Sequence, residues 1–82
     1  MRRGDIVLVT SGHDSGSICM IVAEESEGYV YIANGKQRPV GKPKKKNVKH
    51  LKMICGYDLE GQPTNKQLKR ILSAYKQPLM GG

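Results

Sequence analysis

The chain has 82 residues, enough for one small domain but too few for a separate catalytic domain or a pocket between two domains. Its only aromatic residues are four Tyr, which argues against an aromatic-rich groove that reads proline-rich peptides. The formal net charge is +7, and residues 28–57 hold eight Lys or Arg without a single acid. Such a segment predicts one basic surface suited to polyanions.

Strand signals dominate the first two thirds of the sequence. Short apolar runs rich in β-branched residues predict four strands, over 5–10, 17–23, 29–33 and 48–54. Asn34-Gly35 directly follows the third run, and Asn-Gly is the strongest short hairpin signal. We therefore expect a returning arm over 36–40, at an edge because of Pro39, and a basic loop over 41–47.

One helix is predicted near the end of the chain. Thr64 and Gln67 have the spacing of a capping box, and Pro78 would stop the helix, which gives a span of 64–77. An apolar stripe at helical spacing comprises Leu68, Ile71, Leu72 and Tyr75. We expect this stripe to pack on the strands; a helix that binds a partner is the alternative. The fold class is therefore mainly β, a small barrel of four to five strands (1–55), a linker (56–63), one C-terminal helix and a flexible tail (78–82).

The sequence offers little for catalysis or for metal binding. Cys19 and Cys55 are 36 residues apart in apolar strings, so we interpret both as small core residues; a disulfide or redox pair is the alternative. His13 and Asp14 are adjacent, whereas a catalytic triad needs partners from different elements. We therefore expect no enzyme activity, cofactor, metal site or small-molecule substrate. Since there is neither a signal peptide nor a membrane-spanning apolar run, we expect a cytoplasmic protein.

Residues 4–22, from Gly4-Asp5 through the loop 11–16 to Val22, look like a KOW motif: strand, glycine-bearing loop, strand. Segments 29–40 and 42–51 resemble bacterial KOW-domain RNA-binding proteins, which are similar to KOW-bearing large-subunit ribosomal proteins of archaea and eukaryotes. The resemblance covers residues 4–55 and implies an SH3-like barrel, with ribosomal or other structured RNA, on the large ribosomal subunit, as partner. The first loop departs from the family, because it carries His13, Asp14 and Ser15 where many KOW loops carry Lys or Arg.

The expected RNA contacts lie mainly in the acid-free segment, because phosphate binding needs positive charge that no local acid neutralises. They comprise Lys36, Arg38, Lys42, Lys44, Lys45, Lys46, Asn47, Lys49, His50 and Lys52, with further contacts from the loop residues Ser11, Gly12, His13 and Gly16. Lysines act as point charges, whereas Arg38 can form a two-pronged contact with phosphate or a guanine edge. Tyr29 and Tyr31 are candidates for base stacking or for packing at the barrel rim.

Several functions remain open at this point. An RNA-associated protein of this size can be a constitutive ribosomal component or an accessory factor. An SH3-like module that binds an acidic or extended protein segment is the main alternative, and duplex DNA is a weaker one. In each case we expect a monomer.

Overall fold

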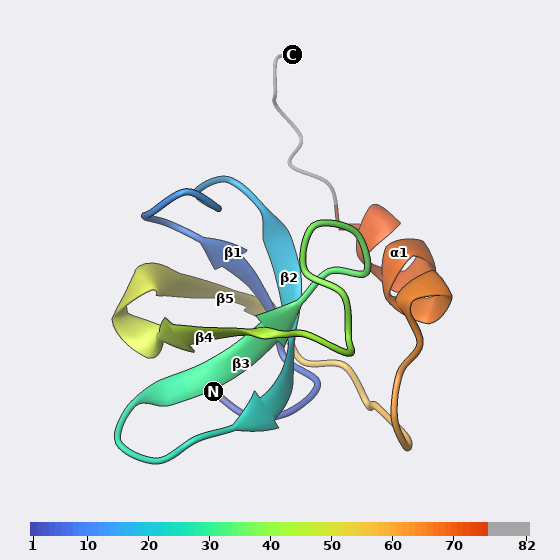
Figure 1. Cartoon of the computed structure of the whole chain (residues 1–82), viewed down its shortest axis with the longest axis horizontal. Helices are drawn as coiled ribbons and strands as arrows, with labels where there is room; N and C mark the ends of the chain where they lie inside the picture. The colour runs from blue at the N-terminus through green and yellow to red at the C-terminus, as the bar shows by residue number, and fades with distance from the viewer. Residues whose placement is uncertain (76–82) are drawn as a thin grey trace.

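The structure is a computed structural model that describes residues 1–75. Five antiparallel strands form one sheet in the order β4-β3-β2-β1-β5 (Figure 1). They are β1 (Ile6–Val9), β2 (Ile18–Glu24), β3 (Tyr29–Ala33), β4 (Lys44–Asn47) and β5 (Leu51–Cys55). A 3-10 turn, η1 (Val48–His50), joins β4 to β5, and the helix α1 (Asn65–Ser73) follows. The predicted fold class, a small, mainly β barrel with one C-terminal helix, is confirmed.

The concave side of the sheet encloses the larger part of the core. Its buried side chains come from four strands: Val7, Val9, Cys19, Ile21, Val30, Ile32 and Leu51. Register shifts between Ile6 and Val7 and between Ile21 and Ala23 interrupt the ladders, and irregularities of this kind let a small sheet curl on itself. Cys19 is buried and free, as predicted, and Cys55 is also free.

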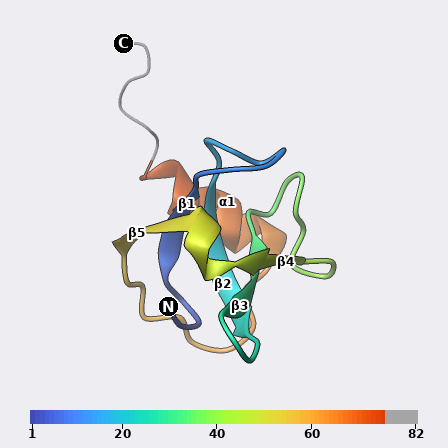
Figure 2. The same ribbon diagram turned by 90° about the vertical axis from the view of Figure 1, so that its left-hand side faces the viewer.

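The outer side of β1, β2 and β3 is covered by α1. Leu68 and Leu72 are buried against Ile6, Met20 and Ala33, and Ile71 and Tyr75 pack at the margin of the same cluster. Each such leucine stabilises the fold by about 1.5–3 kcal/mol. In Figure 2 the helix lies behind the strands, while β4 and β5 face the viewer. The predicted stripe is therefore used inside the domain, and its main residues are not available to a partner helix.

The start of α1 has the predicted capping box. The Thr64 hydroxyl accepts from the Gln67 backbone N–H at 3.1 Å, and the Gln67 side chain accepts from the Thr64 N–H at 2.9 Å. The helix ends at Ser73, earlier than predicted, where the Ala74 and Tyr75 N–H groups close the last turn on Ile71 and Leu72 carbonyls. Residues 76–77 of the predicted helix and the predicted tail 78–82 lie outside the described residues.

Removing this cap should loosen the helix without unfolding the barrel. Thr64→Ala leaves the N-terminal N–H groups of α1 without their acceptor, so the free energy of unfolding should fall by about 1 kcal/mol. Urea unfolding followed by circular dichroism measures this difference. Gln62→Ala, an exposed change two residues earlier, should leave the midpoint unchanged; equal losses in both variants would contradict the assigned cap.

The segment after β3 differs from the sequence prediction. Residues 36–40 are not a returning strand; instead, the Asn34 side-chain oxygen accepts from the N–H groups of Lys36 and Arg38, at 2.9 and 3.1 Å. These bonds close a turn in which Gly35 has φ +84°, so the hairpin expected directly after Asn34-Gly35 does not form. The Asn65 side chain then accepts from the Val40 N–H at 2.7 Å, which ties the segment to α1. The pairing strand forms later, from 44–47, where a loop was predicted.

The predicted linker 56–63 lies against the barrel. Pro63 is buried, Leu59 packs on the cluster beneath α1, and the carbonyl of Tyr57 approaches Gly4 so closely that a Cβ there would collide with it. The Arg3 guanidinium also donates to the Gly61 carbonyl. These contacts hold the connection to α1 in one path across the domain.

Candidate nucleic-acid interface

The lysines of β4 do not project together. Lys44 and Lys46 pair with Ile32 and Val30 of β3, whose side chains point into the core, whereas Lys45 pairs with Tyr31 on the outer side. Because residues directly opposite in an antiparallel ladder share a face, the Lys44-Lys45-Lys46 run is split between the two sides of the sheet. The predicted single basic surface is therefore wrong for these three lysines.

The first loop supplies a carboxylate to the inner side. Asp14 Oδ2 lies 3.0 Å from Arg38 Nη2 and 3.2 Å from Lys44 Nζ, and Arg38 Nε also donates to it at 3.3 Å. The Asp14 side chain is only 12% exposed. Its burial acts to raise the pKa of the carboxyl, but hydrogen bonds from Arg38 and Lys44 outweigh burial, so the pKa lies below the ordinary value of 3.8. The expectation that no acid neutralises this segment is therefore wrong at Arg38 and Lys44.

Lys46 is almost enclosed beneath the same loop. The residue is 9% exposed, and its Nζ would lie 2.8 Å from a Cβ placed on Gly12. Among residues 1–75 no carboxylate lies within 4.0 Å of this ammonium group. Burial, and next to it the negative charge of Asp14, raises the pKa of the Cys19 thiol to about 12. The positive charges of Arg38 and Lys46 act in the opposite direction but do not cancel this increase. Cys19 is therefore a protonated core thiol at neutral pH, as the sequence interpretation requires.

A group of outward cations lies along β4, η1 and the start of β5, at the end of the domain remote from α1 (Figures 1 and 2). We call Lys45, Lys49, His50 and Lys52 the cationic arm; all four residues are exposed. The Lys45 Nζ lies 5.0 Å from the centre of the Tyr29 ring, and 3.5 Å from Glu25 in a surface ion pair of small energetic value. Tyr29 itself is 38% exposed, which leaves part of its ring open to solvent.

Asn47 shapes this arm. Its side-chain oxygen accepts from the Lys49 N–H at 2.9 Å and caps η1, so one predicted contact residue has a structural role. The Val48 N–H donates to the Gly28 carbonyl at 2.9 Å, which holds η1 beside Tyr29. Lys49 and His50 thereby project from a short, hydrogen-bonded turn instead of a free loop.

The other predicted contacts lie elsewhere. Lys36 and Lys42 are exposed on the segment between β3 and β4, and Lys36 lies near α1. In the first loop Gly12, His13 and Gly16 are exposed and Ser11 is half-buried. Both glycines have positive φ and serve the loop's own hydrogen bonds, from Ser15 N–H to Gly12 and from Gly16 N–H to Val9. Turn geometry alone therefore accounts for these glycines.

The sequence reasoning missed the main role of Asp14. In the sequence Asp14 stands out only as a neighbour of His13 and as a departure from the KOW loop pattern, whereas the fold brings it against Arg38 and Lys44. Within residues 1–75 no group of three His, Cys, Asp or Glu side chains is placed to hold a metal ion. No helix in that same part of the chain has the length and apolarity needed to cross a bilayer.

No family model matches this chain, and no curated protein matches it either. The KOW resemblance of residues 4–55 thus stays a prediction from the motif.

Proposed function

We propose that this protein is a non-catalytic, cytoplasmic RNA-binding domain that binds ribosomal RNA on the large ribosomal subunit through its cationic arm. The observation that carries the proposal is the exposure of Lys45, Lys49 and Lys52 on one hydrogen-bonded stretch of chain. Lys49 and Lys52 have no carboxylate within 4.0 Å among residues 1–75, and the partner of Lys45 is a weak surface pair. Phosphate contacts from such lysines displace condensed counterions and supply most sequence-independent affinity.

Tyr29 extends this contact to unpaired bases. Its exposed ring is next to Lys45, so a strand whose phosphates meet the lysines can stack one base on the ring. Stacking on an aromatic side chain is worth about 1–3 kcal/mol per base. The arm therefore favours RNA with single-stranded or bulged nucleotides over regular duplex.

We infer a smaller RNA contact surface than the sequence predicts. Asp14 neutralises Arg38 and Lys44, and Lys46 is enclosed, so we infer that these three cations contribute little to RNA binding while Asp14 is in place. The two-pronged contact expected of Arg38 is already made, with a carboxylate. What remains for RNA is a smaller set of exposed lysines.

Crosslinking in cells tests the proposal. After ultraviolet irradiation, RNA attached to the protein is purified and sequenced, and we expect most reads to map to large-subunit ribosomal RNA near unpaired nucleotides. Sedimentation in a high-salt gradient then separates two roles, because a ribosomal component stays on the large subunit whereas a factor washes off. Absence of crosslinked RNA, with the protein present at normal levels, would overturn the proposal.

One observation favours the alternative of a protein-interaction module. β5 lies at an end of the sheet, and Met53 and Ile54 on this strand are 45% and 40% exposed. An extended segment of another protein can add to such a strand through main-chain hydrogen bonds. Met53→Lys should abolish that association and leave RNA crosslinking intact, which separates the two functions.

A further inference from the structure

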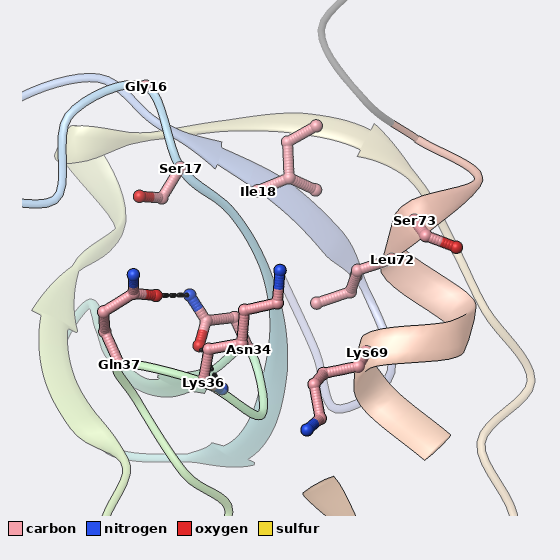
Figure 3. A pocket seen from close by; sticks show the side chains of 9 residues that line it. All are labelled: Gly16, Ser17, Ile18, Asn34, Lys36, Gln37, Lys69, Leu72 and Ser73. Carbon is pink, nitrogen blue, oxygen red and sulfur yellow. Dashed lines mark hydrogen bonds between the residues drawn. The ribbon is translucent and has the colours of Figure 1, made fainter. Parts of the chain in front are cut away.

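A groove lies between the turn at 34–37 and α1, on the side of the barrel away from the cationic arm. Its volume is about 360 Å³, within the range of about 300–1,000 Å³ that is usual for small-ligand sites. Figure 3 shows Lys36 on the turn and Lys69 on α1 across from it, with Ile18 and Leu72 on one side of both lysines. The lining contains no acidic residue.

The walls of this groove are fixed before any ligand arrives. Gly35 packs on the first turn of α1, where a Cβ would lie 2.5 Å from the Asn65 carbonyl oxygen. The Asn65 side-chain oxygen accepts a hydrogen bond from the Val40 N–H. The Asn34 side-chain oxygen accepts from the N–H groups of Lys36 and Arg38. A preformed site loses little conformational entropy on binding.

The groups that face the groove match a nucleotide. Lys36 and Lys69 have no carboxylate within 4.0 Å among residues 1–75, so both charges are free to meet an anion. The Gln37 side-chain oxygen Oε1 accepts from the Asn34 side-chain nitrogen Nδ2 at 3.3 Å. The Gln37 side-chain nitrogen has no hydrogen-bond partner among those residues and can donate to a ligand. Ile18 is half-buried and supplies most of the apolar surface that a flat ring can contact, whereas Leu72 is only 7% exposed and lines the groove from the core side.

We propose that this groove holds one unpaired nucleotide, with its phosphate between Lys36 and Lys69 and its base against Ile18 and Leu72. Gln37 and Ser17 then meet the polar edge of the base. The nucleotide's origin in the bound RNA rests on the proposed function, but its binding does not, because free mononucleotides carry the same chemistry. Since the groove has no aromatic lining residue, it binds by charge and edge contacts and not by stacking.

Nuclear magnetic resonance with ¹⁵N-labelled protein tests the site. Uridine and adenosine 5′-monophosphate, the matching nucleosides and inorganic phosphate are added separately at the same ionic strength. We expect saturable shifts at Ser17, Asn34, Gln37 and Lys69 with the nucleotides, and at least about ten-fold weaker binding of nucleoside or phosphate alone. Amides of the cationic arm should not shift at the same concentrations.

Paired variants with equal charge provide the control. Lys36→Ala with Lys69→Ala should weaken mononucleotide binding about ten-fold or more, whereas Lys66→Ala with Arg70→Ala, on the exposed side of the same helix, should not. Gln37→Ala should weaken it without any change of charge. Equal losses in both double variants, or equal binding of phosphate and nucleotide, would overturn the groove as a nucleotide site.

The outcomes separate the two proposals. Mononucleotide binding in the groove with no RNA crosslinked in cells would support the groove and refute the proposed function. RNA binding by the intact protein with no groove shifts, from mononucleotides or from a ten-nucleotide RNA, would refute the groove and leave the proposed function standing.

Discussion

Gly35→Ala should lower the free energy of unfolding by about 3 kcal/mol. Two effects add at this position. Gly35 has φ +84°, which an L side chain rarely adopts, and its Cβ would lie 2.5 Å from the carbonyl oxygen of Asn65. Backbone cannot move aside as a flexible side chain can, so the turn or α1 must shift. Guanidinium unfolding monitored by circular dichroism measures the loss.

Alanine variants of two other glycines distinguish the cost of backbone strain from the cost of a steric clash. Gly16 has φ +91° but open space around it, so Gly16→Ala should cost only the strain of the backbone conformation, about 1 kcal/mol. Gly41 has neither a positive φ nor a neighbour within 4 Å, and Gly41→Ala should be neutral within about 0.5 kcal/mol. A Gly35→Ala loss no larger than that of Gly16→Ala would show that the turn does not pack on the helix as described.

Asp14→Asn should change stability and RNA affinity in opposite directions. The carboxylate holds Arg38 and Lys44 at 3.0 and 3.2 Å, so its loss should lower the free energy of unfolding by about 2 kcal/mol. In the native protein the Asp14 carboxylate forms ion pairs with Arg38 and Lys44, as an RNA phosphate could. The same change therefore leaves both cations able to contact a phosphate. RNA affinity should rise about three- to ten-fold, and the salt dependence should steepen by about 0.7 per new phosphate contact.

The pH dependence follows from the lowered pKa of Asp14. A carboxyl whose pKa is depressed in the folded state stabilises the fold above its ordinary value of 3.8, and this stabilisation is lost as the pH falls through the folded-state pKa. Asp14→Asn should therefore remove part of the acid-induced loss of stability. Asp58→Asn is exposed and changes the net charge equally, so it controls for both effects. Identical RNA affinities in the two variants would contradict the proposed role of Asp14.

Local sequence patterns predicted those elements whose conformation depends on nearby residues. The alternation in Tyr29–Ala33 predicted β3 to the residue, and the spacing of Thr64, Gln67 and Leu68 predicted the start and buried face of α1. Each of these signals lies within a few residues of chain. Capping and side-chain alternation are set within a few residues, so both elements could be predicted without knowing their tertiary contacts.

The β4 region could not be predicted in the same way. Lys44–Asn47 has no β-branched or aromatic residue, and its strand conformation comes from pairing with β3. That pairing buries Lys46 and turns Lys44 toward Asp14, which is 30 positions away in the sequence. Counting charge along the chain treats neighbouring lysines as one surface, whereas a strand sends them to opposite faces. The groove beside α1 likewise depends on residues from three separate segments.

The affinity of a triple variant for a single-stranded RNA, measured over a range of salt concentrations, is the most direct test of the cationic arm. Lys45→Ala, Lys49→Ala and Lys52→Ala together should weaken binding at least about ten-fold near 0.1 M salt, and should flatten the log–log salt slope by about 2, from three phosphate contacts at about 0.7 each. Arg2→Ala, Lys66→Ala and Arg70→Ala remove the same charge from exposed positions elsewhere and should leave the slope nearly unchanged. Equal slopes in the two triple variants would contradict RNA binding through this arm.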